Sequence, residues 1–366
     1  MKTKTYGPPW VVIGGGNGGQ SLAGHLGLMG YTVRLVDVVP EIVDAIRSQG
    51  GITLNGLISG FGRVELATSD PAEALAGAGI IVVVTPANAH RDVARSCAPF
   101  LSDGQMVFIH PGATGGALEF RKVLRDQECG ARVVILESDS LIYACRSPQP
   151  GQASILGIKK DLLVAALPAA ETSRPLEMLQ TVFPQIRAGR NVLETSLGNP
   201  NAMVHPAPTL LNTSLIESGR DWLYYWDGMT PSIGAFVEAM DQERLAVARA
   251  FGLKLPSIRE WYRLAYGAEG STLSQAVRNN CAYEKVSGQK SLRTRYLLED
   301  IPMGLLPMVS IGKMMGVDVP RMQTILNLAQ FLTGEDFISN GRTVERLGLS
   351  GMNAAQILRY VETGTL

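Results

Sequence analysis

The sequence is short of charge. Charged residues make up 18% of its 366 residues, against about 25% in a typical soluble protein. The 33 Lys and Arg balance the 33 Asp and Glu, so the formal net charge is zero. A protein that binds nucleic acid or an anionic lipid surface needs a surplus of Lys and Arg to neutralise phosphates. The composition therefore excludes nucleic acid and a membrane surface as main partners.

Long apolar runs and paired cysteines are also missing. The longest purely aliphatic stretch, residues 80–84, is far below the roughly 20 residues that cross a bilayer. The four cysteines are scattered without CxxC spacing, which indicates neither a disulfide framework nor a metal site. Residues 1–5 carry two lysines and no apolar segment of the signal-peptide type. We therefore expect a cytoplasmic protein.

The first half of the chain alternates strand and helix patterns, which predicts a parallel sheet covered by helices. Helices are expected over residues 18–29 and 40–49. Some strands are nearly continuous in aliphatic residues, as strands buried on both faces are. The expected strands, of which the last two are assigned to the same sheet, are residues 10–14, 32–37, 80–85, 106–110, 132–137, 153–158 and 161–166.

The second half changes to long helical periods with few β-branched clusters, which predicts helices. They are expected over residues 200–218, 230–251, 257–266, 297–317, 321–332 and 354–361. The length suits two domains at about 150 residues each, and the segment 180–189 reads as the hinge. The predicted fold is α/β: an N-terminal Rossmann-type doubly wound parallel sheet over residues 1–188, and an all-helical C-terminal domain over residues 189–366.

A glycine-rich loop joins the first expected strand to the first helix. Gly14, Gly16 and Gly19 have the spacing G-x-G-x-x-G, with Asn17 and Gly18 between the last two. In a dinucleotide-binding loop the first glycine permits the tight turn, the second lets a pyrophosphate approach the backbone, and the third lets helix and strand pack closely. The alternative is a glycine-rich turn that binds nothing.

An acidic residue strengthens the dinucleotide interpretation. Asp37 ends the second expected strand, 18 positions after Gly19, where a carboxylate accepts hydrogen bonds from the adenine ribose. Arg34 lies in the same strand, but Val38 and Val39 follow the acid where a 2′-phosphate would require a basic or hydroxyl side chain. We therefore expect NAD(H) as the preferred cofactor and leave NADP(H) open.

Two further strand ends carry turn residues, since ligands of open α/β sheets bind beyond the carboxyl ends of strands. The first contains Pro86 and the second contains His110 and Pro111. We expect both to line the nicotinamide side of the cofactor. Ordinary turn chemistry explains such Pro and Gly clusters equally well.

A dehydrogenase needs a proton donor, and histidine has the side-chain pKa nearest neutrality. His205 is the strongest candidate among four histidines, because Asn201 precedes it by one helical turn. Pro206 is expected to kink that helix. A core or surface position remains the alternative for His205. The other histidines are more easily explained by packing, capping, a surface position or structural hydrogen bonds; they are His25, His90 and His110.

The second polar cluster spans residues 293–302. Asp300 beside an imidazole would fix its tautomer, and Arg295 could hold a carboxylate through two parallel hydrogen bonds. The alternative is a capped helix start with ion pairs on a solvated face.

These segments together resemble the opine dehydrogenase family, and within it the N-(1-D-carboxyethyl)-L-norvaline dehydrogenase type. The resemblance covers nearly the whole chain. Its motifs are the loop of residues 14–19 with Asp37, residues 110–122, Asn201 with His205 and Pro206, Arg295 and Tyr296 with Glu299 and Asp300, and residues 342–350.

The resemblance implies a Rossmann domain, a helical substrate-binding domain that also dimerises, and a homodimer. It implies a catalytic His and Asp pair, which falls on His205 and Asp300, and a carboxylate-binding arginine, which falls on Arg295. One departure is His110, where Asn is expected before Pro-Gly, and the change could alter the pH dependence of binding.

The expected reaction joins a 2-oxo acid such as pyruvate to the amino group of an apolar amino acid or amine, with NADH reducing the imine. Aromatic and Met positions at helical spacing are candidates for the amine site; they are Met203, Leu211, Trp222, Tyr224, Tyr225 and Met303. One rival is a ketone-reducing enzyme of the ketopantoate reductase or glycerol-phosphate dehydrogenase type. These use a lysine early in the helical domain, and residues 191–251 contain none. Another rival is a non-catalytic NAD-sensing module.

Overall fold

The computed structural model describes residues 7–365 and divides into two compact units. The sheet unit contains residues up to Gly112, then Gly116–Val192 and Val361–Gly364. The helical unit contains Ala113–Gly115 and Leu193–Tyr360. We expected a boundary at residue 188, whereas this division of the main chain falls between residues 192 and 193. Residues 1–5, interpreted above as free of a signal segment, lie outside the described residues.

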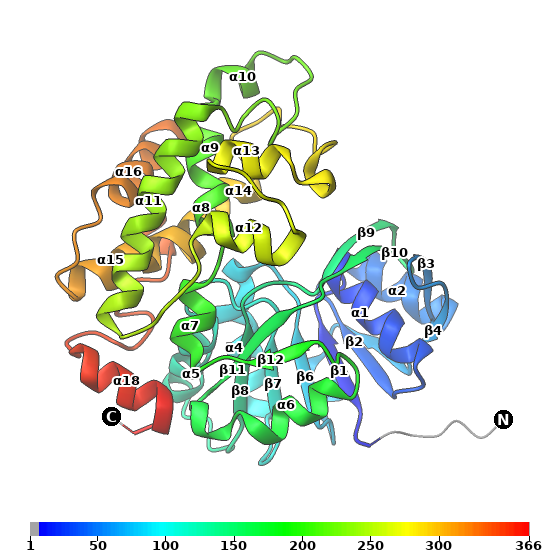
Figure 1. Ribbon diagram of the computed structural model, residues 1–366. Coiled ribbons are helices and arrows are strands. Elements are labelled where there is room, and N and C mark those ends of the chain that lie inside the picture. Colours follow the sequence, from blue (N-terminus) through cyan, green and yellow to red (C-terminus); the bar gives the residue numbers. More distant parts are fainter. Residues whose placement is uncertain (1–6, 366) are drawn as a thin grey trace. The chain divides into compact units, whose positions relative to one another are not determined.

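An eight-stranded sheet forms the centre of the sheet unit (Figure 1). Six strands are parallel, and the last two along one edge run antiparallel to them. The order is β12 (Ile186–Ala188), β11 (Leu162–Leu167), β8 (Val134–Ser138), β7 (Met106–Ile109), β6 (Ile80–Val83), β1 (Trp10–Ile13), β2 (Val33–Val36) and β5 (Leu66–Thr68).

The central strands are buried on both faces. Every residue of β1, β6 and β7 is buried, which agrees with their aliphatic runs. Helices pack on both faces of such a sheet. They are α1 (Asn17–Leu28), α2 (Pro40–Gln49), α3 (Pro71–Leu75), α4 (His90–Cys97), α5 (Gly116–Asp126) and α6 (Ser173–Gln180). The chain leaves β1 for β2 on one side and returns to β6 on the other, so the topological switch point lies beside β1.

The predicted strand over residues 153–158 exists but belongs to a different sheet, so that assignment was wrong. A second sheet has the order β4 (Gly60–Arg63), β3 (Gly51–Gly56), β10 (Gln152–Ile158) and β9 (Tyr143–Gln149). Along β10, Ala153 and Ile155 are buried while Leu156 is 62% exposed. This alternation is typical of a strand with one solvated face, not of a strand buried inside a parallel sheet.

The expected hinge over residues 180–189 is also different in the structure. Part of it is β12, which pairs in parallel with β11 at the edge of the main sheet. Strand β11 itself is antiparallel to β8. Residues 186–188 are therefore a regular edge strand, and the short length of β12 hid it from a periodicity argument.

The helical unit contains no strand among its described residues, only one isolated bridge between Leu223 and Ser287. Its helices are α7 (Val192–Leu197), α8 (Asn201–Val204), α9 (Pro206–Leu211), α10 (Thr213–Glu217), α11 (Pro231–Ala250), α12 (Ile258–Tyr266), α13 (Leu273–Arg278), α14 (Arg295–Leu298), α15 (Leu306–Met314), α16 (Pro320–Thr333), α17 (Phe337–Asn340) and α18 (Ala354–Thr363), whose end groups with the sheet unit.

Two expected helices are interrupted in the helical unit. The predicted helix over residues 200–218 is three short helices, and the one over residues 297–317 contains the five-residue π-helix η5 (Ile301–Leu305). Prolines explain much of this, because Pro lacks the N–H that continues a helix. Both interruptions fall on the polar clusters that the sequence singled out.

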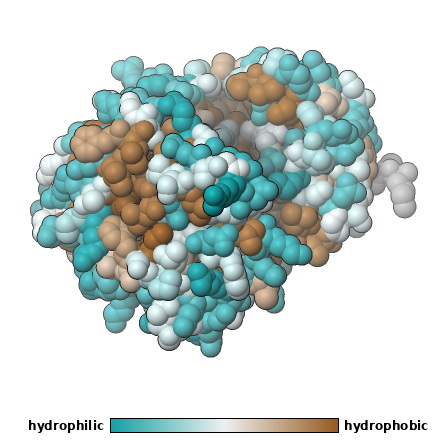
Figure 2. All heavy atoms as spheres, turned by 90° about the horizontal axis from the view of Figure 1, so that it is seen from above, coloured by the Kyte–Doolittle hydropathy of each residue, from teal (hydrophilic) through white to brown (hydrophobic). Residues whose placement is uncertain are grey.

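Apolar side chains also reach the surface of the helical unit. Phe331 is 83% exposed, and Leu211, Leu332 and Ile338 are each exposed by 43% to 48%. Helix α9, which ends at Leu211, packs against α16, which carries Phe331 and Leu332. Figure 2 shows apolar side chains collected into patches on the face drawn. Across residues 7–365, no helix is both long enough and apolar enough to span a membrane.

Candidate active site

The backbone conformation and surroundings of the three spaced glycines match the role that was expected of each. Gly14 has φ +104°, a conformation that side-chain-bearing residues rarely adopt. A Cβ on Gly19 would lie 1.6 Å from the carbonyl oxygen of Gly14, so helix α1 packs directly on the turn. A Cβ on Gly16 would meet no atom within 4 Å. The middle glycine therefore faces open space, where a ligand phosphate could approach the backbone.

The start of α1 is suited to an anion. Its N-cap residue is Gly16, and no side chain caps the first turn. The first amides of a helix and its dipole together attract phosphate. The Asn17 side chain is directed elsewhere, because its Oδ1 accepts a hydrogen bond from the Ser147 amide at 2.8 Å. Gly18 packs against Val84, so within the loop Gly18 has a packing role and Asn17 offers its backbone.

Asp37 holds the loop from the end of β2. Its carboxylate accepts hydrogen bonds from the amides of Gly15 and of Val39, the second at 2.8 Å. Arg34 is engaged away from the acid, with Glu65 at 3.2 Å and the carbonyl of Ala76 at 2.7 Å. A carboxylate at this strand end suits ribose hydroxyls. The engagement of Arg34 leaves a 2′-phosphate without that partner.

The strand end after β6 carries an unusual hydroxyl. Thr85 Oγ1 is buried and has no hydrogen-bond partner. Pro86, the expected cofactor residue, follows it and is exposed at the start of the 3₁₀ turn η1 (Ala87–Ala89). A buried hydroxyl without a partner is rare. Together with the open space at Gly16, it makes this edge of the sheet fit a bound dinucleotide.

The side chain of His110, an expected cofactor contact, is not free to bind a ligand through its ring nitrogens. It is 2% exposed, its Nδ1 lies 2.7 Å from Ser138 Oγ, and its Nε2 accepts from the Ile142 amide at 3.2 Å. Burial, with a smaller effect of Lys159, lowers the pKa of His110 to about 3. Both ring nitrogens are occupied and the ring stays neutral near pH 7, so protonation of His110 does not supply a pH dependence there. Pro111, joined to His110 by a cis peptide bond, is half-buried.

The two remaining histidines are structural. His25 Nδ1 lies 2.8 Å from the hydroxyl of Tyr143, which belongs to the second sheet. His90 is completely buried at the start of α4, so the surface position considered for it was wrong.

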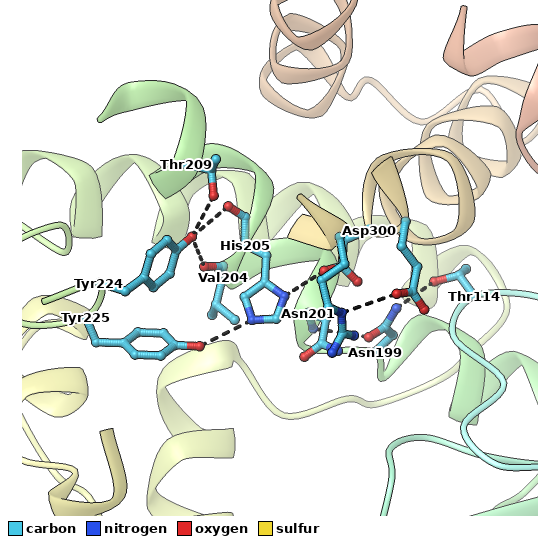
Figure 3. A network of polar contacts seen from close by, with 11 residues as sticks. Thr114, Asn199, Asn201, Val204, His205, Thr209, Tyr224, Tyr225 and Asp300 are labelled. Carbon is cyan, nitrogen blue, oxygen red and sulfur yellow. Dashed lines mark hydrogen bonds and ion pairs between the residues drawn. The ribbon is translucent and has the colours of Figure 1, made fainter. Parts of the chain in front are cut away.

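In the helical unit the structure brings His205 and Asp300 together. Nδ1 of His205 lies 2.7 Å from Oδ2 of Asp300, and both side chains are less than 10% exposed. The other ring nitrogen, Nε2, lies 3.2 Å from the hydroxyl of Tyr225 (Figure 3). A carboxylate that accepts from Nδ1 leaves the lone pair of the neutral ring on Nε2. The pair therefore has the form of a general acid and base with an orienting carboxylate.

The sequence around His205 breaks the helix at the histidine. Pro206 and Pro208 lack the N–H groups that a continuous helix would direct back to α8. The hydroxyl of Tyr224 lies 2.9 Å from the carbonyl oxygen of His205 and 3.3 Å from that of Val204 (Figure 3). This tyrosine therefore compensates for a donor that the prolines remove and fixes the backbone beneath the imidazole.

Asn201 lies one turn before His205, as the spacing predicts. Its carbonyl accepts from the His205 amide at 3.1 Å, and its own amide donates to Asn199 Oδ1 at 3.1 Å. Asn199 in turn donates from Nδ2 to Thr114 Oγ1 at 3.3 Å. Asn199, which the sequence argument did not select, thus anchors the start of α8.

Arg295 is the first residue of the short helix α14, and Asp300 follows shortly after its end. Nε of Arg295 lies 3.2 Å from Oε2 of Glu299, and the arginine side chain is 60% exposed. The Asp300 amide donates to the carbonyl of Arg295 at 3.1 Å, and its carbonyl accepts from Leu305 at 2.9 Å. Burial opposes and the nearby Glu299 favours the guanidinium, whose pKa is raised overall. The ion pair uses one of the five N–H groups of Arg295.

Tyrosines surround the dyad; the sequence argument did not name Tyr283 and gave Tyr296 no role. The ring of Tyr296 stacks on His205 with centroids 3.8 Å apart and planes at 5°. Tyr283 stacks on Tyr225 at 4.1 Å and 17°. Of the expected amine-site positions, Tyr224 and Tyr225 join this cluster, whereas Leu211 is 43% exposed. The signal was the density of aromatic residues after residue 221, but no periodicity ties it to Tyr283 or Tyr296.

The sheet edge and the dyad define a class of protein. A glycine loop with a ribose-binding acid at the switch point of a parallel sheet is typical of dinucleotide binding, and the helical unit carries a buried acid–base pair. The chain is thus an NAD(P)-dependent oxidoreductase. Across residues 7–365, no group of three or more His, Cys, Asp or Glu side chains could hold a metal ion.

Comparisons with known proteins then identify the family. Residues 188–333 match the NAD/NADP octopine/nopaline dehydrogenase α-helical domain, and residues 10–120 match the NAD-dependent glycerol-3-phosphate dehydrogenase N-terminus. An opine dehydrogenase of Arthrobacter sp. (strain 1C) is 43% identical over 364 residues, which cover 99% of this chain and 100% of that protein. The chain belongs to the opine dehydrogenase family.

Solved structures agree on the fold. A structure of octopine dehydrogenase with NADH and L-arginine has a TM-score of 0.81 at 23% identity and covers 98% of both chains. A ketopantoate reductase of Ralstonia eutropha JMP134 has a TM-score of 0.62 at 20% identity, covering 88% of this chain and 98% of that one. The rival class thus shares the architecture, while family membership favours the opine dehydrogenases and sets aside a non-catalytic module.

Proposed function

We propose that the protein joins a 2-oxo acid of the pyruvate type to the amino group of an apolar L-amino acid and reduces the resulting imine, as an enzyme of the N-(1-D-carboxyethyl)-L-norvaline dehydrogenase type. The observation that carries the proposal is the buried pair of His205 and Asp300. Condensation needs a base that frees the amine and an acid that expels water, and one imidazole serves both steps in turn.

Asp300 keeps the imidazole in the productive tautomer. Since its carboxylate accepts from Nδ1, Nε2 is the atom that becomes protonated when the substrate ammonium loses its proton, and the imidazolium that forms is stabilised across 2.7 Å. The imidazolium then supplies a proton for the hydroxyl of the carbinolamine, which leaves as water and yields the imine. Asp300 stays ionised throughout, so its role is orientation and charge stabilisation.

Two neighbours are assigned to substrate positioning. Arg295 presents an exposed guanidinium, whose geometry matches the carboxylate of either substrate. Asn201 lies on the same turn as His205, where a side-chain amide can hold the oxo acid or the imine. Such positioning contributes much of the rate enhancement when the cofactor carries the hydride chemistry.

For the cofactor we propose NAD(H) in preference to NADP(H). Bound NADH supplies the hydride that reduces the imine carbon. The Gly14, Gly16 and Gly19 loop, with the first amides of α1, would hold the pyrophosphate, and Asp37 the adenine ribose. Asp37 would repel a 2′-phosphate, and Arg34 is engaged by Glu65 and by backbone carbonyls. Pro86 and Pro111 are proposed contacts near the nicotinamide, and His110 is left only with its ring face or backbone.

An apolar amine partner is supported by the surroundings of the dyad. The rings of Tyr224, Tyr225 and Tyr296 lie against or beside His205. Burial raises the pKa of Tyr224 and of Tyr225 well above the usual range, so these hydroxyls stay neutral. Of the acids at the site, Asp300 is bonded to the imidazole and Glu299 pairs with Arg295. A cationic side chain would therefore compete for carboxylates already engaged.

The experiment follows NADH oxidation with pyruvate and single amino acids. We expect turnover to require the amino acid, to favour norvaline, Met, Leu or Phe over Arg and Lys, and to fall when NADPH replaces NADH. His205→Asn should lower kcat on the order of 10²–10⁴-fold. The matched control is His25→Asn, which removes a hydrogen-bonded imidazole at the end of α1 far from the glycine loop. Oxidation of NADH by pyruvate alone would instead favour a ketone reductase.

We also propose that the protein is a homodimer. Phe331 and Leu332 are exposed on α16, which packs against α9 with its exposed Leu211, and the burial of such apolar surface is favourable. Light scattering should give twice the chain mass, and Phe331→Glu should give a monomer. Leu264→Glu is the control, since Leu264 is 63% exposed on α12. A monomeric wild-type protein would contradict the proposal.

A further inference from the structure

The working nitrogen of His205 already has a partner. With Nδ1–H donated to Asp300, Nε2 accepts, and the hydroxyl of Tyr225 at 3.2 Å is the donor. Figure 3 shows Tyr225 and Asp300 on opposite sides of the imidazole. A proton that travels from substrate to Nε2 therefore meets the hydroxyl of Tyr225 first.

Both rings are held in place. His205 is 6% exposed and lies flat on Tyr296 with centroids 3.8 Å apart. Tyr225 is 5% exposed, lies flat on Tyr283 at 4.1 Å, and meets the edge of Tyr224 at 4.9 Å. Stacked and buried aromatic rings do not turn aside easily. The hydroxyl is thus a fixed part of the path to Nε2 and not a side chain that swings away.

The hydroxyl can pass a proton but cannot act as a base by itself. Burial raises the pKa of Tyr225 well above the usual range, and nearby tyrosines add to the shift. The tyrosinate is therefore not populated near pH 7. The phenol oxygen still has lone pairs that accept a proton while its own proton leaves toward Nε2.

We propose that Tyr225 is a proton relay between His205 and the substrate, a role that rests on the proposed condensation. In the first step a substrate N–H bond breaks and a new O–H bond forms on Tyr225. The original O–H bond of Tyr225 breaks and an Nε2–H bond forms, which leaves a neutral amine, a neutral tyrosine and an imidazolium paired with Asp300.

The reverse transfer completes the dehydration. The neutral amine adds to the carbonyl carbon, which forms the C–N bond of the carbinolamine as one N–H proton passes to the former carbonyl oxygen. The Nε2–H bond then breaks as its proton moves to the oxygen of Tyr225, and the proton that Tyr225 took from the substrate moves to the carbinolamine hydroxyl. The C–O bond breaks with its electron pair on oxygen, water leaves, and the nitrogen lone pair forms the C=N bond. Protons and electrons balance, and the tyrosine ends each half as it began.

The test compares Tyr225→Phe with Tyr262→Phe. Tyr262 lies in the same aromatic cluster, is completely buried, and its hydroxyl has no hydrogen-bond partner. We expect Tyr225→Phe to lower the single-turnover rate about 100-fold with KM for pyruvate changed only a few-fold, whereas Tyr262→Phe keeps the wild-type rate. Matching unfolding transitions for the two variants would exclude misfolding as the cause.

The solvent isotope dependence separates a relay from a structural role. In mixtures of H₂O and D₂O the wild-type rate should follow a curve, because two protons move together, and the residual rate of Tyr225→Phe a straight line.

Each contrary result has a definite meaning. A rate for Tyr225→Phe within threefold of wild type overturns the relay, and so does a slow variant whose isotope dependence is unchanged. A wild-type solvent isotope effect near one overturns it as well. An active His205→Asn enzyme would instead contradict the proposed function itself, whatever Tyr225 does.

Discussion

The sheet unit and the helical unit form their candidate sites from different chemical groups. At the sheet edge the candidate groups are backbone amides of the Gly14, Gly16 and Gly19 loop and the open space at Gly16. In the helical unit they are side chains, His205 and Asp300, from segments 95 positions apart. The first site depends on the path of the chain, and the second depends on packing between distant segments.

This difference decides how each half responds to change. A backbone site tolerates most side-chain substitutions and fails when a Cβ is added at a close approach. A side-chain site loses its chemistry when one polar atom is removed, while the fold around it remains. The four predictions below test that contrast, beginning with the largest effect.

Gly19→Ala should prevent the sheet unit from folding normally. The added Cβ would lie 1.6 Å from the Gly14 carbonyl oxygen, and the shift that relieves this contact should cost more than about 4 kcal/mol. Gly16→Ala is the matched variant, because its Cβ meets nothing within 4 Å. It should unfold within about 0.5 kcal/mol of wild type yet bind NADH at least about tenfold more weakly. Thermal unfolding measures the stability, and fluorescence titration measures the affinity for NADH. Equal stability of the two variants would contradict the expected difference between a close approach and open space.

Asp300→Asn should leave the fold intact and lower kcat by roughly 10³-fold. The amide can present a donor to Nδ1 and so favour the wrong imidazole tautomer, and it cannot stabilise the imidazolium. Initial rates with pyruvate and an apolar amino acid measure the loss. Asp318→Asn, on an exposed connection before α16, is the control. Near-normal turnover in Asp300→Asn would show that the carboxylate only supports the fold.

His110→Asn should make the protein less sensitive to acid. In the folded chain the pKa of His110 is about 3, against 6.5 for a free histidine. Between these values only the unfolded chain binds the proton. The free energy of unfolding of the wild type therefore falls by up to about 1.4 kcal/mol per pH unit as the pH drops below 6.5.

The test for His110 compares how much the denaturant midpoint of each protein changes with pH. Denaturant midpoints of both proteins are compared at pH 7 and pH 4.5, which cancels any constant effect of the lost bonds to Ser138 and Ile142. A difference in denaturant midpoint between the two proteins that is the same at both pH values would contradict a buried, neutral His110.

Arg295→Lys should have the smallest effect, a rise of about tenfold in KM for one substrate with kcat changed little. Lysine keeps the charge but not the two parallel hydrogen bonds of a guanidinium. Arg293→Lys provides a close control, since Arg293 is 63% exposed and pairs with Glu335. Equal KM values in the two variants would remove Arg295 from substrate binding.

The parts of the molecule that could be predicted are those with local causes. The spacing of Gly14, Gly16 and Gly19 was sufficient because the positive φ of Gly14, the open space at Gly16 and the contact of Gly19 with Gly14 all belong to one turn and the start of one helix. Strands such as β6 and β7 were found because they consist entirely of apolar residues, as strands buried on both faces do. Strand β10 was assigned to the wrong sheet, since its partners β3 and β9 are decided by the tertiary fold.

The helical site was only partly within reach of the sequence. The one-turn spacing of Asn201 and His205 was local and is present in the structure. The pairing of His205 with Asp300 came from family resemblance, because no period links segments so far apart. The stacking of Tyr296 on the imidazole and the bond from Tyr225 to Nε2 had no sequence signal. Both arise from packing that only the folded helices define.

Two prolines, Pro206 and Pro208, follow His205, and the second makes the chain depend on the residue at position 224. Pro208 cannot donate to the carbonyl of Val204, and Tyr224 places its hydroxyl 3.3 Å from that oxygen. A chain that keeps Pro208 has a reason to keep a donor at position 224, so substitutions at the two sites should not be additive. In a double-mutant cycle, Tyr224→Phe should cost less in the Pro208→Ala background than in the wild type. The backbone that carries His205 would then be maintained by two residues that change together, not by each residue separately.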